Sequence, residues 1–176
     1  MVPPDELKTG YRGNRPRLGG DPHLKPRTPA PAAPPAAVAT EGPAKKRVLF
    51  VCLGNSCRSQ MAEALARAYG SDVLEAQSAG LTPAAIIAPL TRKVLEERNL
   101  SVDGHFPKGL DLAMREPFDL VINMSGLPVS LGKSRILVWV VRDPIGESED
   151  VYRDVVQQIE GLVMGLILNL RGGRMP

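Results

Sequence analysis

Cysteine is scarce in this sequence: the 176 residues include two, Cys52 and Cys57, which stand five positions apart. So few cysteines exclude the disulfide framework of a small secreted domain. The first 45 residues also lack any continuous apolar stretch, which predicts neither a secretory signal nor a membrane span. We therefore expect a cytoplasmic protein with reduced thiols and no membrane partner.

Large apolar residues are also few in the first 45 positions, and no regular periodicity occurs there. This segment holds 10 of the 17 prolines, with a run rich in Ala and Pro over residues 28–37. Such a segment cannot bury enough surface to offset the entropy lost on ordering. We predict a disordered, Pro/Ala-rich basic tail over residues 1–45 and a folded domain over residues 46–172.

The net charge of +3 is divided unevenly along the chain. Residues 1–47 carry nine Lys and Arg against four Asp and Glu, whereas residues 48–176 carry 13 against 15. The basic character thus belongs to the tail. A solvated linker or a mispredicted start codon explains it better than attraction to an anionic surface or nucleic acid. We expect no nucleic-acid partner and a monomeric protein.

The two cysteines belong to a strand–loop–helix unit. Residues 48–51 form an apolar run typical of a buried strand, and residues 61–68 are rich in strong helix formers. A loop at the N-terminus of a helix is a natural anion site, because backbone N–H groups converge there and the helix dipole adds positive potential. The same dipole and Arg58 are expected to favour the thiolate form of Cys52. The unit predicts an oxyanion held beside a sulfur nucleophile.

Spacing alone does not support this interpretation, because a free Cys is usually a small buried hydrophobe. An Arg six positions after a Cys also arises easily by chance in a chain rich in arginine. The loop between them decides the matter, since Gly54 and Asn55 are the residue types that best tolerate left-handed backbone angles. A loop that wraps its amides round a phosphate needs such angles.

The rest of the domain alternates between strands and helices. Strands are predicted at residues 73–78, 120–124 and 136–141, and helices at residues 89–99 and 147–170. The last two strands are continuous apolar runs, typical of strands covered on both faces. This alternation predicts a three-layer α/β/α sandwich with a parallel sheet and right-handed crossovers. Cys52 and Asp143 both follow strand ends, where such sheets bind ligands.

Residues 52–59, with the sequence Cys-Leu-Gly-Asn-Ser-Cys-Arg-Ser, resemble the phosphate-binding loop of the low-molecular-weight protein tyrosine phosphatases and the related arsenate reductases. Further similarities follow in order: Ser-Ala-Gly at residues 78–80, Asp-Gly-His at 103–105 and Asp-Pro at 143–144. The similarity covers about residues 46–171. It implies four parallel strands in the order 2-1-3-4, with the phosphate-binding loop after strand 1.

The resemblance also implies roles for individual residues. Cys52 would be the nucleophile, and Arg58 would bind two phosphate oxygens through its planar fork. Asp143 would act as the general acid and then as the general base. The chemistry requires no metal and no cofactor. Phosphate contacts would come from Leu53, Gly54, Asn55, Ser56, Cys57, Arg58 and Ser59.

Further residues are expected to support the loop. Ser59 could donate its hydroxyl to Cys52 or simply cap the helix. By resemblance, Asn55 holds the loop in shape and His105 contacts that Asn. Cys57 could close a reversible disulfide with Cys52, which would protect the nucleophile from irreversible oxidation. The alternative for Cys57 is a small buried loop residue.

The first predicted activity is phosphomonoester hydrolysis of the protein tyrosine phosphatase type, through a cysteinyl-phosphate intermediate. Its substrate would be a phosphorylated protein or a small phosphomonoester. Ile145 and Gly146 stand where tyrosine-specific members have aromatic residues, so aryl selectivity is left open. One alternative is reduction of arsenate with an external small thiol, because residues 123–130 contain no cysteine for an internal relay. A second alternative, a non-catalytic phosphate-binding module, is disfavoured by the presence of both Cys52 and Asp143.

Overall fold

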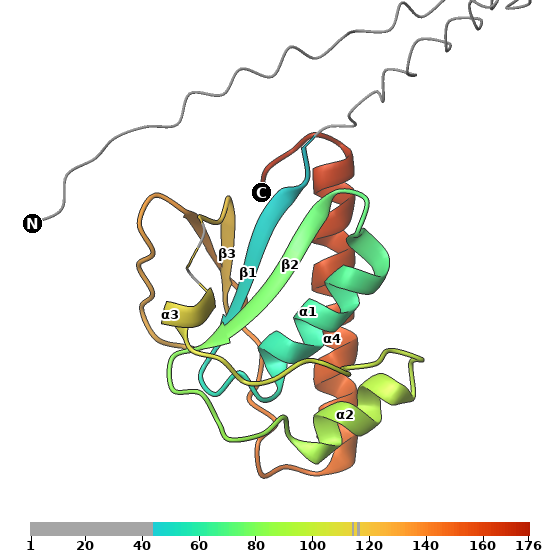
Figure 1. The fold of residues 1–176 in the computed structure, drawn as a ribbon. Coiled ribbons are helices and arrows are strands. Elements are labelled where there is room, and N and C mark those ends of the chain that lie inside the picture. The colour runs from blue at the N-terminus through green and yellow to red at the C-terminus, as the bar shows by residue number, and fades with distance from the viewer. Residues whose placement is uncertain (1–43, 114, 116) are drawn as a thin grey trace, which may run out of the picture. The chain divides into compact units, whose positions relative to one another are not determined.

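The computed structural model describes residues 44–113, 115 and 117–176. The predicted tail over residues 1–45 therefore lies outside the described residues, apart from its last two positions. Helices and strands follow one another along the described chain as β1 (Lys46–Cys52), α1 (Arg58–Gly70), β2 (Leu74–Gly80), α2 (Pro89–Glu96), α3 (Leu110–Ala113), β3 (Leu120–Asn123), β4 (Arg135–Val138) and α4 (Glu149–Arg171) (Figure 1).

The four strands form one parallel sheet in the order β2-β1-β3-β4, which confirms the predicted topology. β1 lies between β2 and β3, and its residues from Val48 to Cys52 are buried. Its register aligns Cys52 with Gly80 of β2 and Val51 with Asn123 of β3. The carboxyl ends of these strands therefore meet at one edge of the sheet, where ligands bind in folds of this kind.

Helices cover the two faces of the sheet to different extents (Figure 1). On one face α1 packs beside α4, and α4 buries Val155, Ile159 and Val163 at helical spacing. On the other face the short helix α3 contributes Ala113 to a smaller core that includes Leu49 of β1. The described domain is thus a three-layer α/β/α sandwich, as predicted. No helix of residues 44–113 or 117–176, the 23-residue α4 included, has the length and apolar content to cross a membrane.

Three details of the elements differ from the sequence predictions. β4 is shorter than predicted and lies at the edge of the sheet, where Val138 is 67% exposed, so it is not covered on both faces. α2 ends at Glu96, because the chain turns out of the helix and Asn99 adopts a left-handed φ of 56°. The helix α3 has four residues, too few to produce a periodic signal, and the sequence pattern does not predict it.

Candidate active site

The loop between β1 and α1 forms the floor of the site. The carbonyl groups of Cys52, Leu53, Gly54 and Ser56 accept hydrogen bonds of 2.8–3.2 Å from amides of residues 81–88, so they face that segment. The amides of residues 53–57 have no backbone acceptor among the described residues. A set of N–H donors is therefore left at the N-terminus of α1, as an oxyanion site requires.

Two residues give the loop its path. Asn55 adopts a φ of 48°, the left-handed conformation predicted for this part of the loop, whereas Gly54 does not. Gly80, at the end of β2, matters because the loop approaches its backbone closely. A Cβ on Gly80 would lie 2.8 Å from the Asn55 nitrogen and 2.9 Å from the Gly54 carbonyl carbon. The loop packs directly on the backbone of β2, and only glycine fits at position 80 without displacing it.

Ser59 lies beside the predicted nucleophile. Its Oγ is 2.9 Å from Cys52 Sγ, and both residues are buried. The side-chain amide of Asn55 donates to Ser59 Oγ at 2.8 Å and to Ser78 Oγ at 2.7 Å, which uses both of its hydrogens. Because Ser59 Oγ accepts from Asn55, its own hydrogen is available for a hydrogen bond to the sulfur. Ser59 lies within α1, whose N-cap is Cys57, so it is not the cap of the helix, and donation from its hydroxyl to Cys52 stays a prediction.

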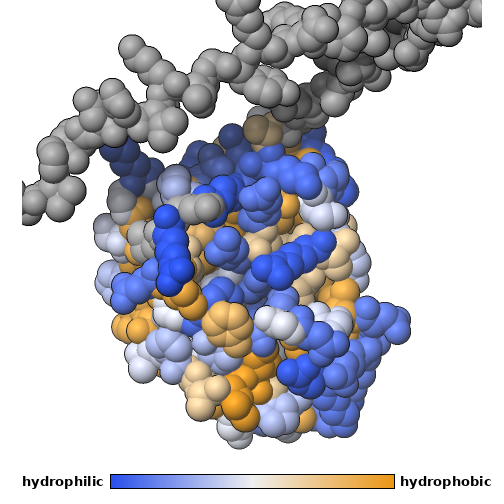
Figure 2. All heavy atoms as spheres, viewed as in Figure 1, coloured by the Kyte–Doolittle hydropathy of each residue, from blue (hydrophilic) through white to orange (hydrophobic). Residues whose placement is uncertain are grey.

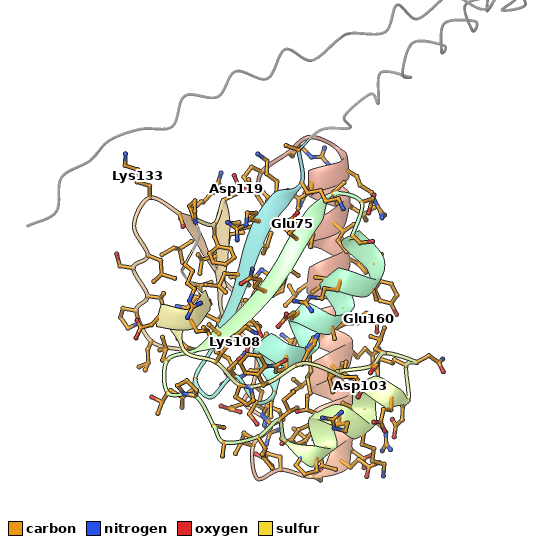
Figure 3. The ribbon with its side chains drawn as sticks, in the orientation of Figure 1. Glu75, Asp103, Lys108, Asp119, Lys133 and Glu160 are labelled. Atoms are coloured by element: carbon orange, nitrogen blue, oxygen red, sulfur yellow. The ribbon has the colours of Figure 1, made fainter. Side chains whose placement is uncertain are left out.

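A buried carboxylate anchors this chain of hydrogen bonds. Ser78 Oγ donates to Glu63 Oε2 at 2.5 Å, and Glu63 is 1% exposed. Two cations balance the charge: Arg67 Nη2 lies 2.5 Å from Glu63 Oε1, and Lys108 Nζ lies 3.5 Å from Oε2. Lys108 lies at the carboxyl edge of the sheet, near the start of α1 (Figure 3). Its backbone amide donates to Asn55 Oδ1 at 2.8 Å, which fixes the orientation of that side-chain amide.

His105 supports the loop through Gln60, and the predicted direct contact with Asn55 is wrong because the buried Gln60 side chain lies between them. His105 Nδ1 is 3.0 Å from Gln60 Oε1. Gln60 Nε2 donates to the main-chain and side-chain oxygens of Asn55 at 3.1 and 3.2 Å. Arg67, which can only donate, lies 3.2 Å from His105 Nε2. Burial lowers the pKa of His105, so the ring is neutral at pH 7 with its proton on Nδ1.

Arg58 is buried at the start of α1 and reaches three other segments. Its Nη1 donates to the carbonyl oxygens of Met124 at 2.7 Å and Val141 at 3.2 Å, and its Nη2 forms an ion pair with Asp143. Its Nε is buried and has no partner among the described residues. A buried N–H without an acceptor is costly, and an oxyanion bound along this edge of the guanidinium would satisfy it.

Asp143 enters the site from the segment after β4. One of its carboxylate oxygens accepts from Arg58, and the other accepts the amide of Ile145 at 3.2 Å in a local turn. The side chain is 41% exposed, in contrast to the buried Cys52. Three segments far apart in the sequence thus bring Cys52, Arg58 and Asp143 to the wall of one pocket of about 380 Å³.

The walls of this pocket are largely apolar. Leu53 and Ile145 both line it and are both exposed. No aromatic side chain occurs among its lining residues in the described chain. Trp139 packs elsewhere, with its ring centroid 5.8 Å from that of Phe50 in the core. The part of the chain that the structure describes holds no group of three or more His, Cys, Asp or Glu arranged for a metal.

Cys57 lines the same pocket and is buried. Burial raises the pKa of its thiol, although the hydroxyl of Tyr152, 3.6 Å from Cys57 Sγ, acts in the opposite direction. Burial also raises the pKa of Tyr152, which comes from α4. Cys57 is therefore a protonated thiol at neutral pH. Both cysteines are free, and the role of Cys57 as a redox partner of Cys52 stays a prediction.

Known proteins share this arrangement of loop and sheet. Residues 47–174 match the family model described as low molecular weight phosphotyrosine protein phosphatase. The chain belongs to this family. Family membership agrees with the resemblance found at residues 52–59 and with the strand order of the sheet.

Relatives in this family include both reductases and phosphatases. A glutaredoxin arsenate reductase from Synechocystis sp. is 32% identical over 130 residues, which cover 71% of this chain and 98% of that protein. The structure of an arsenate reductase in the phosphate-binding state matches with a TM-score of 0.65 and 32% identity, over 71% of this chain and 98% of that one. A low molecular weight protein tyrosine phosphatase from T. tengcongensis matches with a TM-score of 0.62 and 29% identity, over 71% and 99%. The shared fold therefore does not decide between the two activities.

Proposed function

We propose that this protein is a phosphomonoesterase of the protein tyrosine phosphatase type, which works through a cysteinyl-phosphate intermediate. The observation that supports it most strongly is that Cys52, Arg58 and Asp143 line one pocket. A nucleophile, an oxyanion clamp and an acid–base group are the three parts that such a reaction needs. The nucleophile must stay reduced, which fits a cytoplasmic protein.

The first step transfers the phosphoryl group to sulfur. The Cys52 thiolate, with Ser59 donating to it at 2.9 Å, attacks phosphorus in line with the ester oxygen. The P–O bond to the leaving group breaks as an S–P bond forms, and Asp143 gives its proton to the leaving oxygen. The loop amides and Arg58 bind the equatorial oxygens, whose charge they stabilise in the transition state.

The second step releases phosphate. The Asp143 carboxylate takes a proton from water as that water attacks phosphorus, and the S–P bond breaks to restore the Cys52 thiolate. In the structure Arg58 is paired with Asp143. A bound oxyanion carries more charge than the carboxylate and competes for the guanidinium, which frees Asp143 to face the leaving group.

The size and lining of the pocket favour an organic ester over a bare oxyanion. A volume of about 380 Å³ would hold on the order of ten water molecules at about 30 Å³ each. A tetrahedral oxyanion of five heavy atoms fills only part of it. The exposed side chains of Leu53 and Ile145 then provide apolar surface for the organic part of a substrate.

Reduction of arsenate with an external thiol is the second candidate, supported by the reductases among the relatives. An internal cysteine relay after β3 is absent, because the chain has no cysteine beyond Cys57. The corresponding turn is instead closed by Asn123, whose side chain donates to Leu127 O at 2.8 Å and accepts from Ser125. In this candidate the Cys52 sulfur would bind arsenic. One small thiol would attack that sulfur, which breaks the S–As bond, releases arsenite and leaves a mixed disulfide, and a second thiol would restore Cys52, so that two thiols supply the two electrons.

A side-by-side assay separates the two activities. We expect the protein to hydrolyse aryl phosphates and to show no thiol-supported arsenate reduction above that of its Cys52→Ser variant. Cys52→Ser should lose phosphatase turnover, because a serine hydroxyl is not ionised at neutral pH. The variant should still bind inorganic phosphate. Arsenate reduction at a rate above that of phosphate-ester hydrolysis would contradict the proposal.

The role of Asp143 has its own test. Asp143→Asn should slow hydrolysis most for esters with poor leaving groups, because these need a proton as the P–O bond breaks. Activated aryl esters should be affected less in the first step. Equal losses along a series of leaving groups, measured as kcat/KM, would show that Asp143 acts only through its ion pair with Arg58.

A further inference from the structure

A second hollow of about 500 Å³ lies next to the active-site pocket. It is open to the surface and is bordered by the segment that leads into α2, by α2 itself and by the residues before α3. The mechanism proposed above uses none of it. We call it the α2 groove and define it by Ile86, Ile87, Arg92, Glu96, His105 and Phe106.

One short segment separates the α2 groove from the active-site pocket. Thr82 and Ala84 line the pocket, whereas Ala85 and Ile86 line the groove. An extended peptide advances about 3.3–3.6 Å per residue. A chain that leaves the pocket across residues 84–86 therefore enters the groove within roughly two or three residues of the one held in the pocket.

Both sides of the groove are fixed to the oxyanion loop and the first turn of α1. Ser56 Oγ donates to the carbonyl oxygen of Ile86 at 2.9 Å. On the other side Gln60 Nε2 donates to the carbonyl oxygen of Phe106 at 3.2 Å. A groove that is held in shape before binding spends less free energy on ordering its own walls. The same contacts place the groove at a constant distance from Cys52.

Two large apolar residues of the groove are exposed to solvent. The residues Ile86 and Phe106 are 64% and 52% exposed. Figure 2 shows apolar surface gathered below the ends of the strands, over the segment between β2 and α2. Contiguous exposed apolar surface beside a reactive site marks a place where a ligand or a partner binds.

One cation of the groove lies in a weak ion pair. Arg92 has as its ion-pair partner the exposed Asp103, at 3.6 Å, which is a weak pair. Lys93 is engaged by Glu149 at 2.7 Å. Of these two cations Arg92 has the weaker ion pair, so it is the one for which a carboxylate that enters from the pocket side would compete.

We propose that the α2 groove binds the segment of a phosphorylated protein that flanks its phosphorylated residue. A bulky apolar side chain of that segment packs on Ile86 and Phe106, and an acidic side chain pairs with Arg92. The inference rests on the proposed phosphatase function. It also narrows the substrate to a phosphoprotein, since neither arsenate nor a small ester has a chain that could occupy the groove.

The test compares substrates with and without flanking residues. One substrate is a nine-residue phosphotyrosyl peptide with Glu and Leu on both sides of the phosphotyrosine, and the other is N-acetyl phosphotyrosine amide. We expect kcat/KM of the unaltered protein to be about tenfold higher for the peptide, a gain typical of one good subsite. Phe106→Ser and Ile86→Ser should each reduce the gain severalfold and leave p-nitrophenyl phosphate hydrolysis within twofold. Leu168→Ser, an exposed position of α4, is the matched control and should change neither value.

Charge reversal gives a second variant that does not depend on apolar packing. Arg92→Glu should lower kcat/KM for the Glu-flanked peptide and raise it for the same peptide with Lys in place of Glu.

Equal kcat/KM for peptide and amino acid in the unaltered protein would overturn the groove and leave the proposed phosphatase standing. No turnover of p-nitrophenyl phosphate would overturn the phosphatase. In that case fluorescence anisotropy with the labelled peptide tests the groove alone. Equal affinities of the unaltered protein and the same variants for this peptide would overturn the groove.

Discussion

Replacing Ser59 by Ala removes the hydroxyl that lies 2.9 Å from Cys52 Sγ and that would donate to its thiolate. A hydrogen bond to a charged group contributes about 1.5–3 kcal/mol, so the thiolate loses stabilisation of that order. We expect alkylation of Cys52 by iodoacetamide at pH 7 and phosphatase kcat to fall by about tenfold or more. Ser130→Ala, at an exposed loop position, is the control. Unchanged alkylation would mean that Ser59 only packs in the loop.

Mild peroxide tests the second cysteine. We expect reversible inactivation, because Cys52 would oxidise first to a sulfenic acid and the neighbouring Cys57 would condense with it. The buried Cys57 thiol faces Tyr152 at 3.6 Å in the structure, so the loop must move for the disulfide to form. Cys57→Ser should keep most of the phosphatase activity and lose the recovery that added thiol gives after peroxide. Recovery equal to that of the unaltered protein would reduce Cys57 to a packing role.

Some residues of the site could be predicted from the sequence and others could not, for a physical reason. Cys52 and Asp143 could be placed together from the sequence, since each follows a strand and parallel strands end at one edge. Gln60 and Glu63 could not, because a polar residue in a helix resembles a surface residue until its partners are known. Some of those partners are near in sequence, such as Asn55 and Arg67, but Ser78 and Phe106 lie 15 and 46 positions away along the chain. The one available signal was a Gln and a Glu among the small and apolar residues of α1.

At the scale of an element, the end of β2 carries a testable constraint. Gly80→Ala would place a Cβ 2.8 Å from the Asn55 nitrogen, a contact with backbone that no rotamer can relieve. We expect a loss of about 1–3 kcal/mol in the free energy of unfolding and a large fall in kcat, because the oxyanion loop is displaced. Urea denaturation and turnover of p-nitrophenyl phosphate measure the two effects.

A glycine in α4 provides the control for that experiment. The structure has nothing within 4 Å of a Cβ added at Gly161. Gly161→Ala should therefore stabilise the protein by roughly 0.5–1 kcal/mol, since Ala loses less backbone entropy in a helix, and should leave kcat unchanged. Gly80→Ala with normal stability and normal turnover would show that β2 can retreat from the loop.

Helices and strands could be predicted from the sequence where one face of the element is buried or where both are. The apolar run of β1 and the helical spacing of α4 gave these elements within two residues of their observed ends. β4 was harder, because an apolar run of Ile, Leu and Val looks the same in the centre of a sheet and at its edge. Only the pairing of strands shows that β4 has a neighbour on one side, and pairing depends on contacts across the whole domain.

For the whole molecule, the sequence divides into a domain whose fold could be predicted and a segment that carries much of the basic charge. The alternation of strands and helices predicted the sandwich, and the resemblance added the strand order that the structure confirms. Residues 1–47 hold nine of the 22 Lys and Arg. The charge of the full chain therefore says little about the pocket, where Arg58 is the cation and Asp143 is its partner.

Deleting residues 1–43 tests whether the Pro/Ala-rich segment takes part in the activity of the domain. We expect kcat and KM for p-nitrophenyl phosphate to stay within twofold, because a segment so poor in large apolar residues has little surface to bury on the domain. The melting temperature should change by less than about 2 °C, which corresponds to no more than about 1 kcal/mol in a protein of this size. A basic segment that attracts anionic surfaces would instead reveal itself in binding to phosphatidylserine vesicles at low salt, lost on deletion and screened by about 0.15 M salt. A fall in kcat or a large drop in melting temperature would contradict the boundary predicted at residue 46 and make the segment part of the folded domain.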